Sequence, residues 1–366
     1  MRVFNCDACG HPVFFDSVQC VHCGAFLAFL PQHLQVACLR PAPHPHADTL
    51  WETLPSPARA AAAPARLYKM CSHRGPIGQC NFALPADDPH ALCESCRQTR
   101  WLPDLSDPSN ALRWTRIESA KRQLFYTLAR LGLAPRPGEE GPRFELLADL
   151  PGQTPVMTGH ANGTITLNVV EADDAERARR RQALHEPYRT LLGHLRHESG
   201  HFFWERLVVG TGRIDEFRTL FGDERQDYAQ ALQDYYARDP MDNQWRDSFV
   251  SAYATAHPWE DWAESWAHYL HMVDLLETAA SYGTCIAVPA GSATPPALRV
   301  QDPFADPAPD FDTMLDQWVP LTLLTNSLSR SLGQEDAYPF ALSAGARRKL
   351  EFIYLSVQAG AAGRRA

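Results

Sequence analysis

The sequence contains no uninterrupted run of about 18 apolar residues, which is close to the length that a transmembrane helix requires. It also has no excess of positive charge: 34 Lys and Arg residues are outnumbered by 43 Asp and Glu residues, and the net charge is −9 with His neutral. Such a balance provides no general attraction to nucleic acid or to anionic lipid. We therefore expect neither a membrane nor nucleic acid as a partner of this 366-residue protein.

The first residues also lack the apolar core and the small-residue cleavage site of a secretory signal peptide, and they lead directly to Cys6. We therefore expect a cytoplasmic protein. In a reducing compartment, closely spaced cysteines favour zinc thiolate sites over disulfides. Eight of the ten cysteines form sets with metal-ligand spacing, whereas Cys38 and Cys285 are left over, and Cys38 is interpreted as a free thiol.

The first cysteine set lies in residues 1–31 and consists of Cys6, Cys9, Cys20 and Cys23. Its two C-x-x-C pairs are separated by ten residues, and two such turns can supply the four thiolates of a tetrahedral zinc site. So short a segment cannot fold around a hydrophobic core alone, and a bound metal would supply the missing stability. The pattern predicts a zinc ribbon with one structural zinc ion.

The second cysteine set lies in residues 66–104 and consists of Cys71, Cys80, Cys93 and Cys96. The first two cysteines have an unusual spacing of eight intervening residues, whereas the last two form a regular C-x-x-C pair. We expect a second four-cysteine structural zinc site, with His73 as the alternative to Cys71. Residues 32–65, between the two sets, are rich in Pro and Ala with little hydrophobic periodicity, and they predict a linker.

The rest of the chain has the periodicity of a mostly helical α+β protein. We expect helices at 109–131, 187–209, 214–221, 227–237, 244–256, 259–281, 311–332 and 343–358. Residues 164–170 alternate and are rich in β-branched side chains, which predicts a strand. The Pro-rich residues 283–310 predict a long surface loop.

The expected helix over 187–209 contains the H-E-x-x-H pattern, from His197 and Glu198 to His201. Residues four apart share one face of a helix, so both imidazoles can meet a single metal ion. Glu198 then lies beside that ion, where a metal-bound water needs a general base. The pattern indicates zinc-assisted hydrolysis, and the strand upstream is of the kind that holds an extended peptide by backbone pairing.

A catalytic zinc ion needs a third protein ligand and an open position for water. The sequence lacks a third His at the close spacing found in some zinc proteases, because the residue six beyond His201 is Leu207. The third ligand should therefore be a carboxylate on a later helix. Glu260 and Glu264 share one face of the expected helix over 259–281, so either can bind the metal while the other orients a ligand.

Four segments of the chain resemble a known family. They are Cys93-Glu-Ser-Cys96-Arg97, His197-Glu-Ser-Gly-His-Phe-Phe-Trp204, Leu220-Phe-Gly-Asp-Glu224 and His257-Pro-Trp-Glu-Asp-Trp-Ala-Glu-Ser-Trp-Ala-His-Tyr-Leu270. Through these segments, residues 66–360 resemble zinc-binding metallopeptidases that carry N-terminal zinc ribbons. The resemblance implies a zincin-like metallopeptidase domain over residues 105–362, preceded by two zinc-ribbon modules. It indicates the chemistry but not the substrate.

A more distant resemblance concerns the third ligand. The segment Glu260-Asp-Trp-Ala-Glu264 is similar to the Glu-Phe-Phe-Ala-Glu element in the protease domain of anthrax lethal factor. The similarity implies that Glu260 binds zinc and that Glu264 does not bind zinc itself but contacts a residue that does. It also implies that Tyr253, seven residues before Glu260, stabilises the transition state. The spacing between the second His and the Glu is longer here, so the intervening segment must differ.

Three functions are consistent with these patterns. The favoured one is a zinc peptidase that acts on peptides or proteins. The second is a binding protein whose ribbons contact a protein partner while the peptidase-like domain serves as a scaffold. Nucleic acid is a less suitable partner, because few basic residues lie near the cysteines. The third is a zinc hydrolase that acts on substrates other than peptides, such as a deacylase.

These assignments predict three zinc ions per chain, one catalytic and two structural. Metal analysis of the purified protein by mass spectrometry checks the number. A ratio of two zinc ions per chain would mean that one of the three sites is misassigned.

Overall fold

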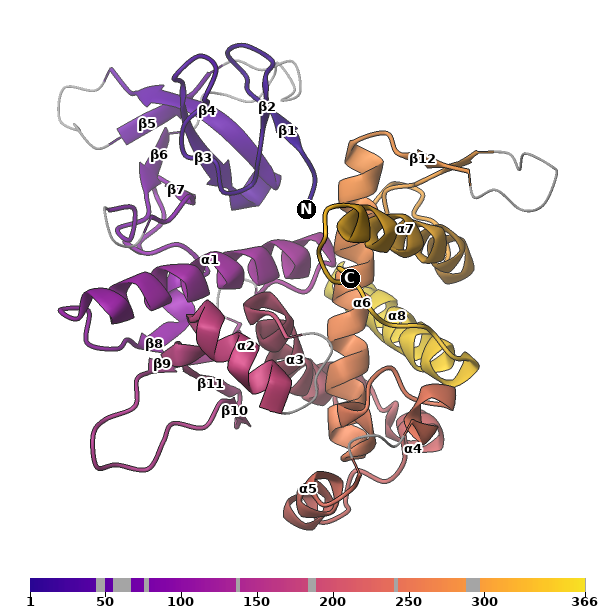
Figure 1. The fold of residues 1–366 in the computed structure, drawn as a ribbon. Helices are drawn as coiled ribbons and strands as arrows, with labels where there is room; N and C mark the ends of the chain where they lie inside the picture. The colour runs from indigo at the N-terminus through magenta and orange to yellow at the C-terminus, as the bar shows by residue number, and fades with distance from the viewer. Residues whose placement is uncertain are drawn as a thin grey trace.

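The computed structural model describes residues 1–43, 50–54, 67–75, 79–135, 139–183, 189–239, 243–287 and 297–365. It confirms a mostly helical α+β protein with an N-terminal zinc-ribbon region. In Figure 1, strands β1–β7 form a lobe beside α1, and the long helix α6 lies between α1–α3 and α7–α8. Within the described part of the chain, no helix combines the length and apolar character needed to span a membrane.

The N-terminal lobe is built on a five-stranded antiparallel sheet in the order β3-β4-β5-β6-β7. Its strands are β3 (Phe26–Leu30), β4 (Gln35–Pro41), β5 (Leu50–Thr53), β6 (Leu67–Met70) and β7 (Ala83–Pro85). A short hairpin of β1 (Phe4–Asn5) and β2 (Pro12–Val13) precedes them. An isolated bridge between Phe29 and Phe82 brings the two ends of the sheet together.

The predicted linker over 32–65 is wrong for residues 35–41 and 50–53, which form β4 and β5 of this sheet. The Pro- and Ala-rich composition of this segment obscures a short apolar run, Val36–Leu39, whose four residues are all buried. Residues 44–49 and 55–66 of the predicted linker lie outside the described residues. The two cysteine sets therefore belong to one sheet-based unit and are not separate modules joined by a linker.

Both four-cysteine sites are present, and in each the four sulfur atoms lie within 4.8 Å of one another. Cys71 completes the second site, whereas His73 packs its ring edge-on against Trp114, with the ring centroids 5.1 Å apart. In the first site, Gly10 and Gly24 follow their C-x-x-C pairs with φ of +74°, a conformation that only glycine adopts readily. Cys38 is buried with its sulfur 3.4 Å from that of Cys6.

A second sheet has its strands in the order β10-β11-β9-β8. Its strands are β8 (Thr99–Trp101), β9 (Arg143–Leu147), β10 (Gly159–Ala161) and β11 (Thr164–Asn168). The pair β10–β11 is antiparallel, and the other pairs are parallel. The predicted strand over 164–170 ends at Asn168, whose side chain accepts a hydrogen bond from the backbone of Val170 and begins a 3-10 turn.

The helices are α1 (Pro108–Arg130), α2 (Asp174–Ala183), α3 (Leu191–Trp204), α4 (Ile214–Phe221), α5 (Tyr228–Tyr236), α6 (Pro258–Ser281), α7 (Phe311–Ser331) and α8 (Ala344–Arg365). A π-helix (Glu205–Val209) extends α3, and β12 (Cys285–Ile286) pairs with β13 (Leu298–Arg299) in the expected loop over 283–310. Helix α3 begins four residues later than predicted, because Thr190 caps it by accepting a hydrogen bond from the backbone of Gly193.

The predicted helix over 244–256 is wrong. Only two 3-10 turns form there, at Gln244–Asp247 and Tyr253–Thr255. The intervening residues make tertiary contacts that a continuous helix does not provide. The backbone oxygen of Ser248 accepts a hydrogen bond from Lys349 of α8, and the hydroxyl of Ser251 donates one to Glu264 of α6.

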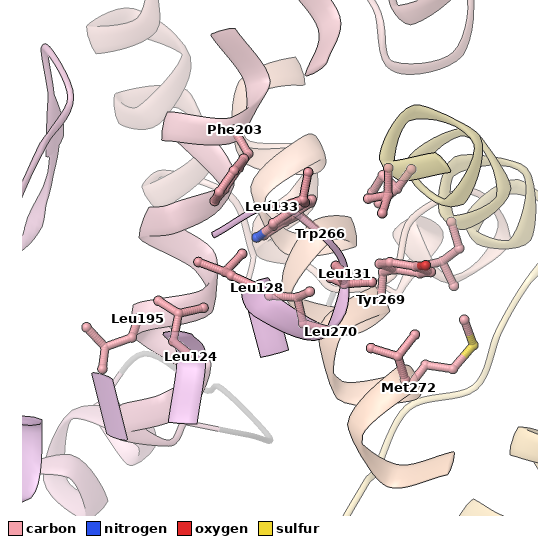
Figure 2. Packing of buried hydrophobic residues seen from close by; sticks show 14 of the residues in the cluster. Leu124, Leu128, Leu131, Leu133, Leu195, Phe203, Trp266, Tyr269, Leu270 and Met272 are labelled. Atoms are coloured by element: carbon pink, nitrogen blue, oxygen red, sulfur yellow. The ribbon is translucent and has the colours of Figure 1, made fainter. Parts of the chain in front are cut away.

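The central contact of the fold is the packing of α3 against α6. Gly200 of α3 lies so close to Ala263 of α6 that a β-carbon at position 200 would lie 2.9 Å from the Ala263 Cα atom. The indole nitrogen of Trp262 donates to the backbone oxygen of Gly200, which fixes the register of the two helices. Figure 2 shows Phe203 of α3 and Trp266 of α6 in the surrounding apolar core, where their rings stack at 5.0 Å.

The substitution Gly200→Ala is expected to lower the free energy of unfolding by about 1–3 kcal/mol, because the added methyl group overpacks a rigid helix contact. Chemical denaturation with urea measures the change. The control is Gly363→Ala in α8, where a β-carbon meets nothing within 4 Å and the stability should change little. Equal stability of Gly200→Ala and wild type would contradict the assigned contact.

Candidate metal centre

Two histidines of α3 and one glutamate of α6 converge at one point. Nε2 of His197 lies 2.9 Å from Oε2 of Glu260, and Nε2 of His201 lies 3.5 Å from Oε1 of the same carboxylate. The three groups can offer ligand atoms that all lie within 4.8 Å of one another. Zinc binds nitrogen and oxygen at about 2.0–2.2 Å in a tetrahedron, so its ligand atoms are about 3.3–3.6 Å apart. The spacing fits a zinc ion.

The surroundings of Glu260 also fit a metal ion. Its side chain is 1% exposed, and among the described residues its Oε2 atom is buried without a hydrogen-bond partner. Burial opposes ionisation, but the nearby His201 and His197 hold the pKa of Glu260 well below its usual range. A buried, ionised carboxylate oxygen that accepts no hydrogen bond is costly, and a cation would offset that cost.

The start of α6 determines where Glu260 lies. His257 is the N-cap residue, and its Nδ1 accepts a hydrogen bond from the backbone of Trp259 at 3.1 Å. Pro258 follows in the first turn, where its missing N–H group costs nothing. Glu260 is therefore held in the first turn of α6, directly opposite the two histidines of α3. His257 has this capping role and is not among the converging ligand atoms.

Glu264, one turn further along α6, contacts the opposite side of His197. Its Oε1 atom lies 2.8 Å from Nδ1 of that ring, and its Oε2 atom accepts a hydrogen bond from Ser251 at 2.6 Å. Burial disfavours its ionisation, yet the contact with His197 lowers the pKa of Glu264 to about 2. Of the two carboxylates that the spacing left open, Glu260 faces the Nε2 atoms of both histidines and Glu264 orients one ring.

The other two predicted site residues lie next to this cluster. Glu198 is 9% exposed and lines a cavity of about 890 Å³. Tyr253, in a 3-10 turn, lines the same cavity, and its ring lies 5.9 Å from that of His197. Burial and the nearby carboxylates, chiefly Glu260, raise the pKa of Tyr253, so its hydroxyl keeps its proton and can donate a hydrogen bond.

The cavity extends beyond the metal centre between α3 and α6. Its lining includes five aromatic side chains outside the metal centre, namely Tyr235, Tyr236, Trp245, Phe249 and Phe340. At another part of the lining, Arg180 and Arg189 pair with the buried carboxylate of Glu171. Such a space, lined by apolar surface with a few charged groups, is typical of a ligand site.

The sequence did not indicate two further residues of the site. The hydroxyl of Tyr228, at the start of α5, donates a hydrogen bond to Oε1 of Glu260 at 2.7 Å. The ring of His160, on β10, lies nearly parallel to that of His201 at 6.0 Å. No local spacing rule connects either residue with the H-E-x-x-H pattern, so only the folded chain reveals them.

The position of His160 shows that the strand beside the site is β10 and not the predicted strand. The predicted strand over 164–170 corresponds to β11, which is paired on one side with β10 and on the other with β9. Both edges of β11 are occupied by these strands, so it cannot hold an extended peptide as expected. Of the two edge strands, β10 and β8, it is β10 whose His160 packs against His201 of the metal centre.

Removal of the charge from Glu264 tests its contact with His197. Glu264→Gln is expected to weaken zinc binding at this centre by about 10–100-fold, because the His197 ring loses its charged acceptor. Competition with a chelator measures the affinity, and the two cysteine sites should keep their zinc. Glu205→Gln, an exposed residue just beyond α3, serves as the matched control. Identical affinities of Glu264→Gln and wild type would contradict the orienting role.

Comparisons with known proteins place the chain in a family. Residues 110–355 match the model of a family described as "Putative zinc-binding metallo-peptidase", and residues 3–107 match that of a zinc-ribbon domain. The chain is 37% identical to three uncharacterized proteins, Mb2598c of Mycobacterium bovis and MT2644 and Rv2568c of Mycobacterium tuberculosis. Each alignment spans 362 residues, 98% of this chain and 95% of the relative. No solved structure matches. The chain therefore belongs to this zinc-binding metallo-peptidase family and has an N-terminal zinc-ribbon domain.

Proposed function

We propose that this protein is a zinc-dependent peptidase that hydrolyses peptide bonds in peptide or protein substrates. The observation that carries the proposal is the convergence of His197, His201 and Glu260 beside a cavity that Glu198 lines. Three protein ligands leave one position of a tetrahedral zinc ion for water, as in catalytic rather than structural zinc sites. The two four-cysteine clusters have no such open position and suit structural zinc ions.

His197, His201 and Glu260 would hold the ion. Bound there, zinc supplies Lewis acidity, which polarises a carbonyl group and lowers the pKa of a bound water towards about 7. Glu264 fixes the His197 ring so that Nε2 points to the ion. Ser251 in turn holds Glu264 by a hydrogen bond to its second oxygen.

Glu198 is the proposed general base. It lies one residue after His197 on α3 and lines the cavity in which a substrate has room to bind. In this position its carboxylate takes a proton from the attacking water and later passes it to the leaving amine. The Tyr253 hydroxyl, which keeps its proton, donates a hydrogen bond to the oxyanion that develops on the substrate carbonyl.

The substitution Glu198→Gln is expected to lower peptidase activity by about 10²–10⁴-fold with zinc still bound, because the amide cannot accept the proton. Cleavage profiles of a peptide library by wild type and variant measure the loss. Glu205→Gln should retain the wild-type profile, because this exposed residue lies outside the site.

The same experiment separates this proposal from the alternatives. A zinc-loaded Glu198→Gln chain with the wild-type cleavage profile would refute Glu198 as the base. A wild-type chain that binds three zinc ions but cleaves no peptide, while it hydrolyses acyl amides or esters in a parallel assay, would favour a different zinc hydrolase.

A further inference from the structure

We infer that Tyr228 is a positioning residue of the metal centre, which holds Glu260 in the orientation that leaves one carboxylate oxygen for the metal ion. The inference rests on the proposed role of Glu260 as a zinc ligand. Its basis is the hydrogen bond of 2.7 Å from the Tyr228 hydroxyl to Oε1 of Glu260.

The two oxygens of Glu260 have different surroundings. Oε1 accepts the hydrogen bond from Tyr228 and lies 3.5 Å from Nε2 of His201, whereas Oε2 lies 2.9 Å from Nε2 of His197 and has no hydrogen-bond partner among the described residues. With Oε1 bound to a hydroxyl, rotation of the carboxylate about its terminal bond is restricted. Oε2 is then the oxygen that remains available to the cation. In other metal sites, hydrogen bonds from residues outside the ligand set orient the ligands in the same way.

The Tyr228 ring is itself held in place. It packs against His257 at 5.2 Å and against Trp259 at 6.3 Å, the residues on either side of Pro258 at the start of α6. Asp227 caps α5 by accepting a hydrogen bond from the backbone of Gln230, so Tyr228 is the first residue of a well-defined helix. The hydroxyl therefore has a fixed position relative to the first turn of α6.

The same contact attaches α5 to the rest of the protein. Helix α5 has no buried residue, yet it contributes Tyr235 and Tyr236 to the wall of the cavity. Tyr228 joins the beginning of this helix to the metal-facing carboxylate. Tyr228 thus links the orientation of Glu260 to the position of α5, which Tyr235 also holds by packing against Tyr253.

Tyr228 and Tyr253 have different roles in this scheme. Tyr253 packs against His197 and lines the cavity, where a substrate carbonyl can reach its hydroxyl. The Tyr228 hydroxyl is engaged with Glu260, and Tyr228 is not among the residues that line the cavity. Removing the Tyr228 hydroxyl should affect zinc affinity, whereas removing the Tyr253 hydroxyl should affect turnover.

The variants Tyr228→Phe and Tyr253→Phe test this difference in the full chain. Tyr228→Phe is expected to raise the zinc Kd of the histidine site by about 10–100-fold, with kcat near that of wild type once zinc is saturating. Tyr253→Phe should keep the wild-type zinc Kd and lose kcat. Chelator competition measures the Kd, and the absorption spectrum of bound Co²⁺ reports the ligand geometry without any substrate.

Tyr282→Phe is the matched control, because Tyr282 is 64% exposed at the end of α6 and should bind zinc as wild type does. Retention of both cysteine-bound zinc ions shows that each variant is folded. An unchanged zinc Kd in Tyr228→Phe refutes the inference, as does a loss of kcat alone, which would assign Tyr228 to the transition state. A wild-type chain that binds zinc only at its cysteine sites would instead refute the proposed function.

Discussion

The close contact of α3 with α6 at Gly200 is the constraint on which the site depends. Because glycine has no side chain, α3 approaches Ala263 closely enough for the first two turns of α6 to reach His197 and His201. Glu260 and Glu264 then meet that pair of rings from two sides. A larger residue at position 200 would separate the helices and increase the distance from Glu260 to both histidines. One small residue within the H-E-x-x-H pattern thus has a structural function of its own.

The ribbon lobe is joined to the helical part by buried polar contacts. Tyr126 of α1 packs among the ribbon residues Phe15 and Phe29, and its hydroxyl donates a hydrogen bond to Glu277 of α6 at 2.6 Å. Arg122 of α1 is 3% exposed; burial disfavours its charge, but the thiolates of the second cysteine site raise its pKa. The ribbon and the metallo-peptidase region therefore share an interface that contains buried charged groups. Each region supplies charges that offset the cost of removing the other region's opposite charges from water.

Local patterns predicted most of the elements, and the exceptions have a common cause. The helices α1, α4 and α6 lie within a residue of their predicted bounds, because their periodicity and capping residues are contained in the local sequence. The predicted linker was wrong over residues 35–41 and 50–53, and the predicted helix over 244–256 was wrong, because distant partners determine these segments. Strands β4 and β5 exist only as members of a sheet, and Ser251 leaves the helical conformation where it contacts Glu264. Neither partner is visible in the local sequence.

The sequence by itself determined the chemistry of the ligands. The i, i+4 spacing of His197 and His201 and the C-x-x-C pairs fix which donor groups are neighbours, because that geometry is set within one helix or one turn. Only the tertiary structure decided how the two glutamates divide their contacts, with Glu260 facing both histidine Nε2 atoms and Glu264 behind one ring. It also introduced Tyr228, from a helix that no spacing rule connects to the site. These arrangements depend on the packing of α5 and α6 around α3, and packing is a property of the folded chain.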